Sequence, residues 1–238
     1  MTQIPFIGYH CDGFPPVENA LEEPNGLLVA GGDLAPERLI EAYSKGIFPW
    51  FEDDQPILWW SPAPRSVLYP AEFSPSKSLK KTIRKKTFQI TFDTVFPEVI
   101  ASCSKPRPSG DGTWITTDMI DAYVRLHQLG FAHSVETWVG DELVGGLYGI
   151  CLGSVFFGES MFSKKSDASK VAFCSLVELC NNKNIGLIDC QVANPHLALI
   201  HICRCRRRGK STSRCASFPP KKHKHTSSIP TQRQPQKK

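Results

Sequence analysis

The chain of 238 residues has an ordinary globular composition and is long enough for one or two domains. No apolar run approaches the roughly 18 residues that span a bilayer, and the start lacks the layout of a secretory signal, so we expect a cytoplasmic protein with reduced cysteines and no membrane segment. The formal net charge of +5 is uneven, because residues 198–238 hold 12 Lys and Arg and no Asp or Glu, which leaves 16 basic against 23 acidic residues before them. A nucleic acid would therefore have to meet a local basic patch of the body.

The N-terminal third combines frequent turn signals with one short predicted helix. FPPVENA, EEPNG and AGGD carry the Gly, Pro, Asn and Asp residues that turns favour. Pro36 stands where a first helical residue belongs, and Gly46 supplies a left-handed stop. The apolar residues between them recur at helical spacing: Leu39, Ile40 and Tyr43. We therefore predict a helix over residues 36–45.

The segment SKSLKKTIRKK, residues 76–86, is the most basic stretch of the body. Its periodicity predicts a helix with Leu79 and Ile83 turned inward and the cations turned outward. These cations are Lys77, Lys80, Lys81, Arg84, Lys85 and Lys86. A strand should follow, because Phe88, Ile90 and Phe92 alternate with polar residues.

The second half predicts alternating helices and strands. A helix over 116–129 should end at Gly130, and three strands follow in AHSVETWV, ELVGGLYGICLG and SVFFGESMF. Asp167 is placed to cap a helix that runs through Cys180, and IGLIDCQV has the pattern of a buried strand. Helix, three-strand meander, helix and strand is the order expected of an acetyltransferase-like mixed sheet, so we predict an α+β fold.

The chain changes character after residue 197. IHICRCRRRGKSTSRC leads into a stretch of Lys, His, Ser, Pro and Gln with almost nothing to bury. Such a composition does not offset the entropy of ordering, so we predict a disordered basic tail over residues 198–238. The tail looks like translation in a shifted reading frame.

Several unusual strings rich in aromatic residues and glycine occur in one order along residues 5–197. They are EPNGLLVAGGDLAPERLIEAYSKGIFPWF, ILWWSPAPRSVL, GTWIT, LGFAHSVE, LVGGLYGI, FFGESMFS with SKKSDASK, and LIDCQ. Together they resemble the signature segments of the leucyl/phenylalanyl-tRNA–protein transferase family. The resemblance implies a small N-terminal domain over 1–64 and an acetyltransferase-like aminoacyl transfer domain over 65–197, which here lacks the family's closing strand and helix.

The resemblance also implies a reaction. Members of the family move Leu or Phe, and less readily Met, from aminoacyl-tRNA to the N-terminal Arg or Lys of an acceptor protein. The new peptide bond marks the acceptor for N-end-rule degradation. The resemblance implies no metal and no cofactor, because aminoacyl-tRNA is a co-substrate, and we expect a monomer.

On this resemblance Asp189 and Gln191 relay a proton from the attacking amine, and Glu159 contacts the amino group of the donor. The apolar pocket for Leu or Phe would be lined by Phe156, Phe157, Met161 and Phe162. Without the resemblance, LIDCQ is a buried strand that ends in polar loop contacts, and Glu159 is a solvated charge. An α-amino group with a pKa near 8 is about a tenth neutral at pH 7, so general-base help of about 10²–10⁴-fold suffices.

The resemblance further implies that Trp50 and Trp114 sandwich the terminal adenine of the tRNA, and stacking is worth about 1–3 kcal/mol per base. In isolation both would be core or interface aromatics. Trp59 and Trp60 are adjacent in a strand and face opposite sides, so we expect at least one in the core. The basic helix would bind tRNA phosphates; its alternative is a solvated helix face. An acidic feature should select the cationic acceptor, and Glu159, Asp189 and Glu136 are candidates.

Other readings explain less of the chain. Cys190 with His196 suggests a thiol nucleophile and base, but an apolar strand around Cys190 favours a buried structural thiol. A zinc site would use the Cys and His residues of the tail: Cys203, Cys205, Cys215, His201, His223 and His225. Their spacing lacks a second ordered pair. A non-catalytic RNA-binding remnant and a cell-wall-type aminoacyltransferase are the remaining alternatives.

Overall fold

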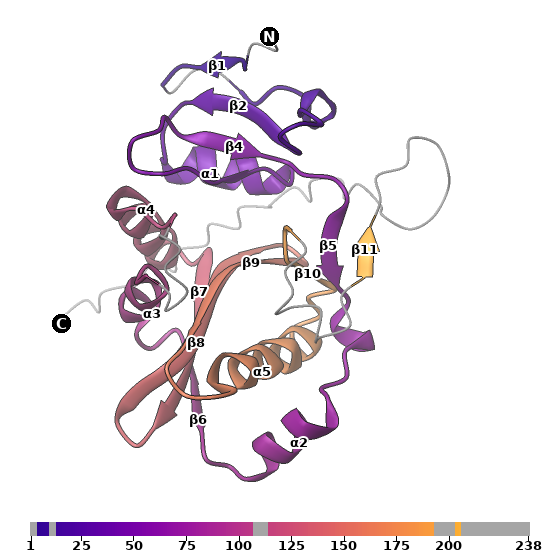
Figure 1. The fold of residues 1–238 in the computed structure, drawn as a ribbon, viewed down its shortest axis with the longest axis vertical. Coiled ribbons are helices and arrows are strands. Elements are labelled where there is room, and N and C mark those ends of the chain that lie inside the picture. The colour runs from indigo at the N-terminus through magenta and orange to yellow at the C-terminus, as the bar shows by residue number, and fades with distance from the viewer. Residues whose placement is uncertain (1–3, 10–12, 107–113, 193–202, 206–238) are drawn as a thin grey trace, which may run out of the picture. The chain divides into compact units, whose positions relative to one another are not determined.

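A computed structural model describes residues 4–9, 13–106, 114–192 and 203–205, and in the last of these ranges the backbone alone. Its compact unit, residues 1–207, contains two β-sheets. The first has the strand order β1-β2-β4-β3 and lies beside helix α1 (Figure 1). Its strands are β1 (Phe6–Ile7), β2 (Leu27–Gly31), β3 (Phe48–Pro49) and β4 (Leu58–Trp60).

The second sheet has seven strands in the order β11-β5-β10-β9-β8-β7-β6. Strand β10 runs parallel to β9, and the other neighbours pair antiparallel. The strands are β5 (Arg65–Leu68), β6 (Gln89–Phe92), β7 (Ala132–Val139), β8 (Glu142–Leu152), β9 (Val155–Ser163), β10 (Leu187–Asp189) and β11 (Cys203–Cys205).

The helices divide between the two faces of the large sheet. Helix α5 packs on one face, and α3 and α4 lie on the other, as Figure 1 shows. The helices are α1 (Pro36–Ser44), α2 (Lys77–Arg84), α3 (Phe96–Cys103), α4 (Thr117–Gln128) and α5 (Ala168–Asn182), with short 3-10 turns at Val17–Asn19 and Pro70–Glu72. The predicted α+β class and the predicted order of helix, meander, helix and strand are confirmed.

Alternation along the strands separates two hydrophobic cores. On β9, Phe156 packs with helix α5, whereas Phe157 packs with Tyr43 and Tyr148 in the core shared by α1, α3 and α4. Successive side chains of a strand point to opposite faces, so one strand serves both cores. The larger core also contains Trp59, which has no exposed surface and donates its indole N–H to the Gly31 carbonyl at 2.9 Å. The small sheet and the large sheet are therefore packed through shared apolar side chains.

Most predicted elements are present within one or two residues, but three details differ. Ile83 is 38% exposed instead of inward, because the short helix α2 buries Leu79 alone. Asp167 precedes α5 but makes no capping bond; its backbone is left-handed (φ 65°), and its carboxylate accepts from Lys170 and Thr82. Helix α3 was not expected from the sequence.

Three residues of the predicted tail belong to the large sheet. Cys203–Cys205 form strand β11, which pairs antiparallel with β5. A sheet edge presents unpaired backbone N–H and C=O groups, and these can recruit even a polar segment. The other residues of 198–238 lie outside the described part of the chain.

Candidate functional site

A buried ion pair marks the end of β10. Arg65, on β5, directs its Nε at both carboxylate oxygens of Asp189, each 2.9 Å away. Strands β5 and β10 pair antiparallel, with Val67 opposite Asp189. Arg65 lies two residues from Val67 on the same face of β5, so its side chain meets that of Asp189. The Arg65 guanidinium lies over the Phe48 ring, 4.9 Å from its centroid. Asp189 is therefore fixed by a cation that is itself held between two sheets.

Gln191 joins this ion pair to Glu159. Its backbone N–H donates to Asp189 Oδ1 at 2.8 Å, and its side-chain Nε2 donates to Glu159 Oε1 at 2.7 Å. Gln191 adopts φ 60°, a left-handed conformation that non-glycine residues rarely hold. Such strain persists where the surroundings over-determine it, and it gathers at functional sites.

Glu159 stands at an irregularity of the β8–β9 pairing. Tyr148 pairs with Ser160 and Gly149 pairs with Gly158, so Glu159 is the extra residue of a β-bulge. Bulges re-aim a side chain and are common beside active sites. Here the Glu159 carboxylate points toward α4, where Tyr123 donates its hydroxyl to Oε2 at 3.2 Å.

The environment of Glu159 favours its neutral form. Burial is the largest effect and raises the pKa of the carboxyl, hydrogen bonds from Tyr43 and Tyr123 and the charge of Arg65 lower it, and the neighbouring Asp189 raises it. The net result is a pKa of about 7. Some of the Glu159 side chain remains accessible, but protein atoms crowd around its carboxylate. A carboxylate of this kind can change its charge near neutral pH, as an acid–base group must.

The four apolar residues predicted to line the donor pocket are divided between the two faces of the sheet, because successive side chains of a strand alternate. Phe156 and Met161 belong to the core against α5, whereas Phe157 and Phe162 belong to the core on the Tyr43 side. Phe156 and Phe157 are buried, and Met161 and Phe162 keep some exposed surface. The four residues are thus close in sequence but lie on two different faces of the sheet.

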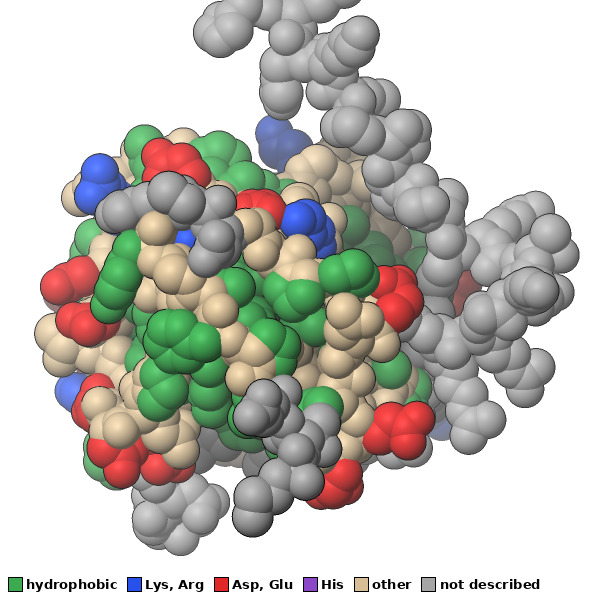
Figure 2. Space-filling model, turned by 90° about the horizontal axis from the view of Figure 1, so that it is seen from above, with side chains coloured by type: hydrophobic (Ala, Val, Ile, Leu, Met, Phe, Trp, Pro, Cys, Tyr) green, Lys and Arg blue, Asp and Glu red, His purple; other side chains and the backbone are tan. Residues whose placement is uncertain are grey.

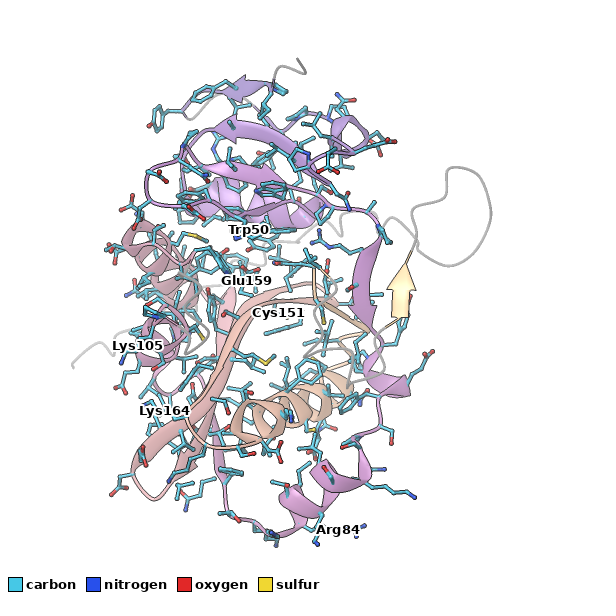
Figure 3. All side chains as sticks on the ribbon, in the orientation of Figure 1. Trp50, Arg84, Lys105, Cys151, Glu159 and Lys164 are labelled. Carbon is cyan, nitrogen blue, oxygen red and sulfur yellow. The ribbon has the colours of Figure 1, made fainter. Side chains whose placement is uncertain are left out.

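The two predicted stacking tryptophans differ in environment. Trp50 follows β3, is 46% exposed and lies 5.5 Å from the Trp60 ring, whose Nε1 donates to the Trp50 carbonyl at 2.7 Å. Trp114 is half-buried against the larger core. Among the described residues no ring contact joins Trp50 to Trp114. In Figure 3, Trp50 and Glu159 both lie toward the small sheet.

The predicted cations of α2 form an exposed group at the other end of the unit, where Figure 3 labels Arg84. All six of them, Lys77, Lys80, Lys81, Arg84, Lys85 and Lys86, are exposed. Figure 2 looks onto the small-sheet end, where hydrophobic and acidic side chains dominate. The exposed cations at α2 therefore offer a surface that is complementary to a polyanion.

A surface cavity of about 530 Å³ lies elsewhere, between the start of α1 and helix α4. Its lining includes Asp33, Glu37, Asp118, Asp121 and Arg125, and none of the predicted site residues. It is therefore not the apolar donor pocket that the sequence suggested.

Two other residues that the sequence suggested for the site, Glu136 and Cys190, have structural roles. Glu136 is fully buried and accepts hydrogen bonds from Thr91 and Ser134, so it cannot meet a cationic acceptor. Burial raises the pKa of Cys190 to about 12, which disfavours the thiolate that a nucleophile needs.

The described residues contain no group of three or more potential metal ligands. The proposed zinc ligands of the tail, and His196, lie outside the side chains that the structure describes. No helix in the described ranges is long and apolar enough to cross a membrane.

Three residues of the network were missed by sequence reasoning: Arg65, Tyr43 and Tyr123. Tyr43 fitted an apolar helical stripe, and Tyr123 lay inside a predicted helix, so neither hydroxyl stood out. Arg65 was visible inside SPAPRSVL, where a cation directly before three residues of a strand, SVL, could have signalled a buried partner.

The mixed sheet of this α+β unit thus carries two carboxylates linked through Gln191, which can bind a cationic group and exchange a proton. Comparison with known proteins gives the class of the protein. The family model described as Leucyl/phenylalanyl-tRNA protein transferase matches residues 67–209, and the model of the N-terminal domain of that transferase matches residues 32–63. The match to the first model continues 12 residues past residue 197, where the family pattern was expected to stop.

Individual relatives of the chain carry the same name as the matching family model. The chain is 59% identical over 184 residues to the leucyl/phenylalanyl-tRNA–protein transferase of Stutzerimonas stutzeri (strain A1501), covering 77% of this chain and 81% of that protein. It is 57% identical over 198 residues to the same-named protein of Saccharophagus degradans (strain 2-40 / ATCC 43961 / DSM 17024), covering 83% and 82%. The chain is thus an aminoacyltransferase, and it belongs to the leucyl/phenylalanyl-tRNA–protein transferase family.

A solved structure, L-PGS from Bacillus licheniformis, is similar with a TM-score of 0.39 and 11% identity, over 70% of this chain and 53% of that one. A likeness this weak says nothing about activity.

Proposed function

We propose that this chain transfers Leu or Phe, and less readily Met, from aminoacyl-tRNA to the N-terminal Arg or Lys of acceptor proteins. Family membership supports the aminoacyl-tRNA donor and the protein acceptor. The acceptor's α-amino nitrogen attacks the carbonyl carbon of the aminoacyl ester, a C–N bond forms, the C–O bond to the ribose breaks, and the ribose oxygen takes up a proton. The product would be marked for N-end-rule degradation, and the enzyme would act in the cytoplasm as a monomer.

The observation that carries this proposal is the continuous network of Asp189, Gln191 and Glu159. Gln191 bonds to both carboxylates, at 2.8 and 2.7 Å. We assign Glu159 to the amino group of the donor, because an ionised carboxylate binds an ammonium group strongly at short range. Asp189 and Gln191 then orient the attacking amine. Positioning of this kind contributes more than proton transfer when the nucleophile is partly neutral already.

The remaining parts of the donor would bind on either side of this network. Trp50 offers an exposed indole for the terminal adenine, with Trp114 as its proposed partner. Of the apolar residues of β9, Phe157 and Phe162 lie on the Tyr43 side and would receive the Leu or Phe side chain. A pocket of this type separates one methylene by about 1–3 kcal/mol. The cations of α2 would bind backbone phosphates without reading sequence, which suits an enzyme that accepts more than one tRNA.

The direct test uses labelled Phe-tRNA and peptides that begin with Arg, Lys or, as a control, Ser. We expect label in the Arg and Lys peptides and none in the Ser peptide. Tight binding of Phe-tRNA without any labelled peptide would instead support the alternative reading, a catalytically impaired family member that retains tRNA binding.

A further inference from the structure

Two tyrosine hydroxyls connect helix α1 to the Glu159 carboxylate. The hydroxyl oxygens of Tyr43, on α1, and Tyr123, on α4, lie 2.5 Å apart, and the Tyr123 hydroxyl donates to Glu159 Oε2 at 3.2 Å. Both tyrosines are buried, with 1% and 0% of their surface exposed. Residues from three elements thus form one chain of hydrogen bonds that ends on the carboxylate.

The hydroxyls are not needed to fill space. Tyr43 packs edge-on against Phe157 with ring centroids 5.3 Å apart, and Tyr123 packs edge-on against Tyr148 at 5.7 Å, contacts that phenylalanine rings would also make. A buried hydroxyl is unfavourable unless it finds a partner, and each of these two finds the other. The polar atoms therefore need an explanation beyond packing.

The structure assigns Tyr123 and Tyr43 as positioning residues of the transfer site. Their hydrogen-bond chain fixes Glu159 Oε2, while Gln191 fixes Oε1 at 2.7 Å, so the carboxylate presents its remaining lone pairs in one orientation to the donor's amino group. This inference rests on the proposed function, because it concerns how the same Glu159 binds the donor. It also makes α1, from the N-terminal part of the chain, a component of the site.

Several elements around Glu159 contribute a titratable or charged group. Besides Tyr43 and Tyr123, these are Tyr148 on β8, Asp189 on β10 and Arg65 on β5. Burial raises the pKa of Glu159, and the hydrogen bonds from the two tyrosines lower it. Removal of the Tyr123 hydroxyl should therefore raise the pKa of Glu159 further, whereas a purely structural role would leave it unchanged.

Tyr123→Phe tests the inference, with Tyr148→Phe as a matched control. Tyr148 is equally buried, and its hydroxyl has no hydrogen-bond partner among the described residues. For Tyr123→Phe we expect the KM for Phe-tRNA to rise about tenfold, as for loss of one hydrogen bond to a charged group. The acidic limb of the pH profile should also move to higher pH. Tyr148→Phe should have the KM for Phe-tRNA and the pH profile of the wild type.

Two further measurements separate positioning from folding. In a Glu159→Gln background, Tyr123→Phe should cause no additional loss, and an unchanged tenfold loss there would overturn the inference. If the wild type transfers no amino acid, the proposed function fails, but the carboxyl ¹³C titration of Glu159 still decides the inference. Its midpoint should be higher in Tyr123→Phe than in the wild type, and equal midpoints would overturn it.

Discussion

The Nε of Arg65 lies 2.9 Å from both carboxylate oxygens of Asp189, while the two terminal nitrogens of its guanidinium are buried without a hydrogen-bond partner among the described residues. The side chains of Arg65 and Asp189 are 14% and 8% exposed. Arg65 therefore holds Asp189 by its charge. Because both side chains are mostly buried, water can do little to replace a missing partner.

Removal of one partner of the Arg65–Asp189 pair should lower the free energy of unfolding far more than removal of both. We expect Asp189→Leu to lower the free energy of unfolding by about 3–5 kcal/mol, because it leaves the Arg65 cation buried and uncompensated. The double variant Asp189→Leu with Arg65→Met should recover much of that loss. Denaturant titrations measure both changes. Equal loss in the single and double variants would show that the ion pair is not what stabilises this region.

Trp50 should matter for the donor and little for folding. Its indole is 46% exposed, so Trp50→Ala should change the free energy of unfolding little, but loss of one stacking partner should raise the KM for Phe-tRNA about 5- to 150-fold. Phe92→Ala serves as the control, since Phe92 is 42% exposed on β6. A Trp50→Ala enzyme with the wild-type KM would remove Trp50 from the adenine site.

The salt dependence of tRNA binding should distinguish α2 from other cationic positions. Arg84→Gln should weaken binding and reduce the slope of log affinity against log salt by about 1, because one phosphate contact is lost. Lys105→Gln makes the same charge change at another exposed position, and Figure 3 labels both residues. We expect the slope of Lys105→Gln to equal that of the wild type. Identical slopes for all three proteins would exclude Arg84 from the tRNA surface.

Gly149 allows β8 and β9 to approach each other at the Glu159 bulge. A Cβ at this position would lie 2.1 Å from the Phe157 carbonyl oxygen, which is backbone and cannot yield without moving the strand. Gly149→Ala should therefore lower stability by about 1–3 kcal/mol or more and reduce transfer. Gly186→Ala is the control, because a Cβ added there would meet no atom within 4 Å beyond its own chain neighbours. Thermal unfolding of the two variants gives the comparison, and a Gly149→Ala protein as stable as Gly186→Ala would contradict it.

The sequence predicted the elements of the large sheet better than the site they build. Strand β7 and helices α1, α4 and α5 follow from apolar periodicity and from end signals such as Pro36 and Gly130, which act locally. Ile83 was predicted wrongly, since a helical period does not reveal whether the inner face of a short helix is covered.

The site depends on contacts between residues far apart in the chain. Arg65 meets Asp189 across 124 positions, and Tyr43 meets Tyr123 across 80, so no local pattern could pair them. The resemblance to a family supplied Glu159, Asp189 and Gln191 one by one. The bulge that turns Glu159 toward Tyr123 arises from strand pairing, which periodicity does not specify.

The rate of transfer by Glu159→Gln against pH tests the central claim most directly. Because the pKa of Glu159 is about 7, the carboxylate gains its negative charge as pH rises through neutrality. We predict that the single-turnover transfer of Phe from Phe-tRNA to an Arg peptide rises over this range in the wild type. In Glu159→Gln transfer should be about tenfold slower above pH 8, and the rise with pH that remains should follow the acceptor's α-amino group alone, whose pKa is near 8. A Glu159→Gln enzyme with the rate and pH profile of the wild type would contradict the account.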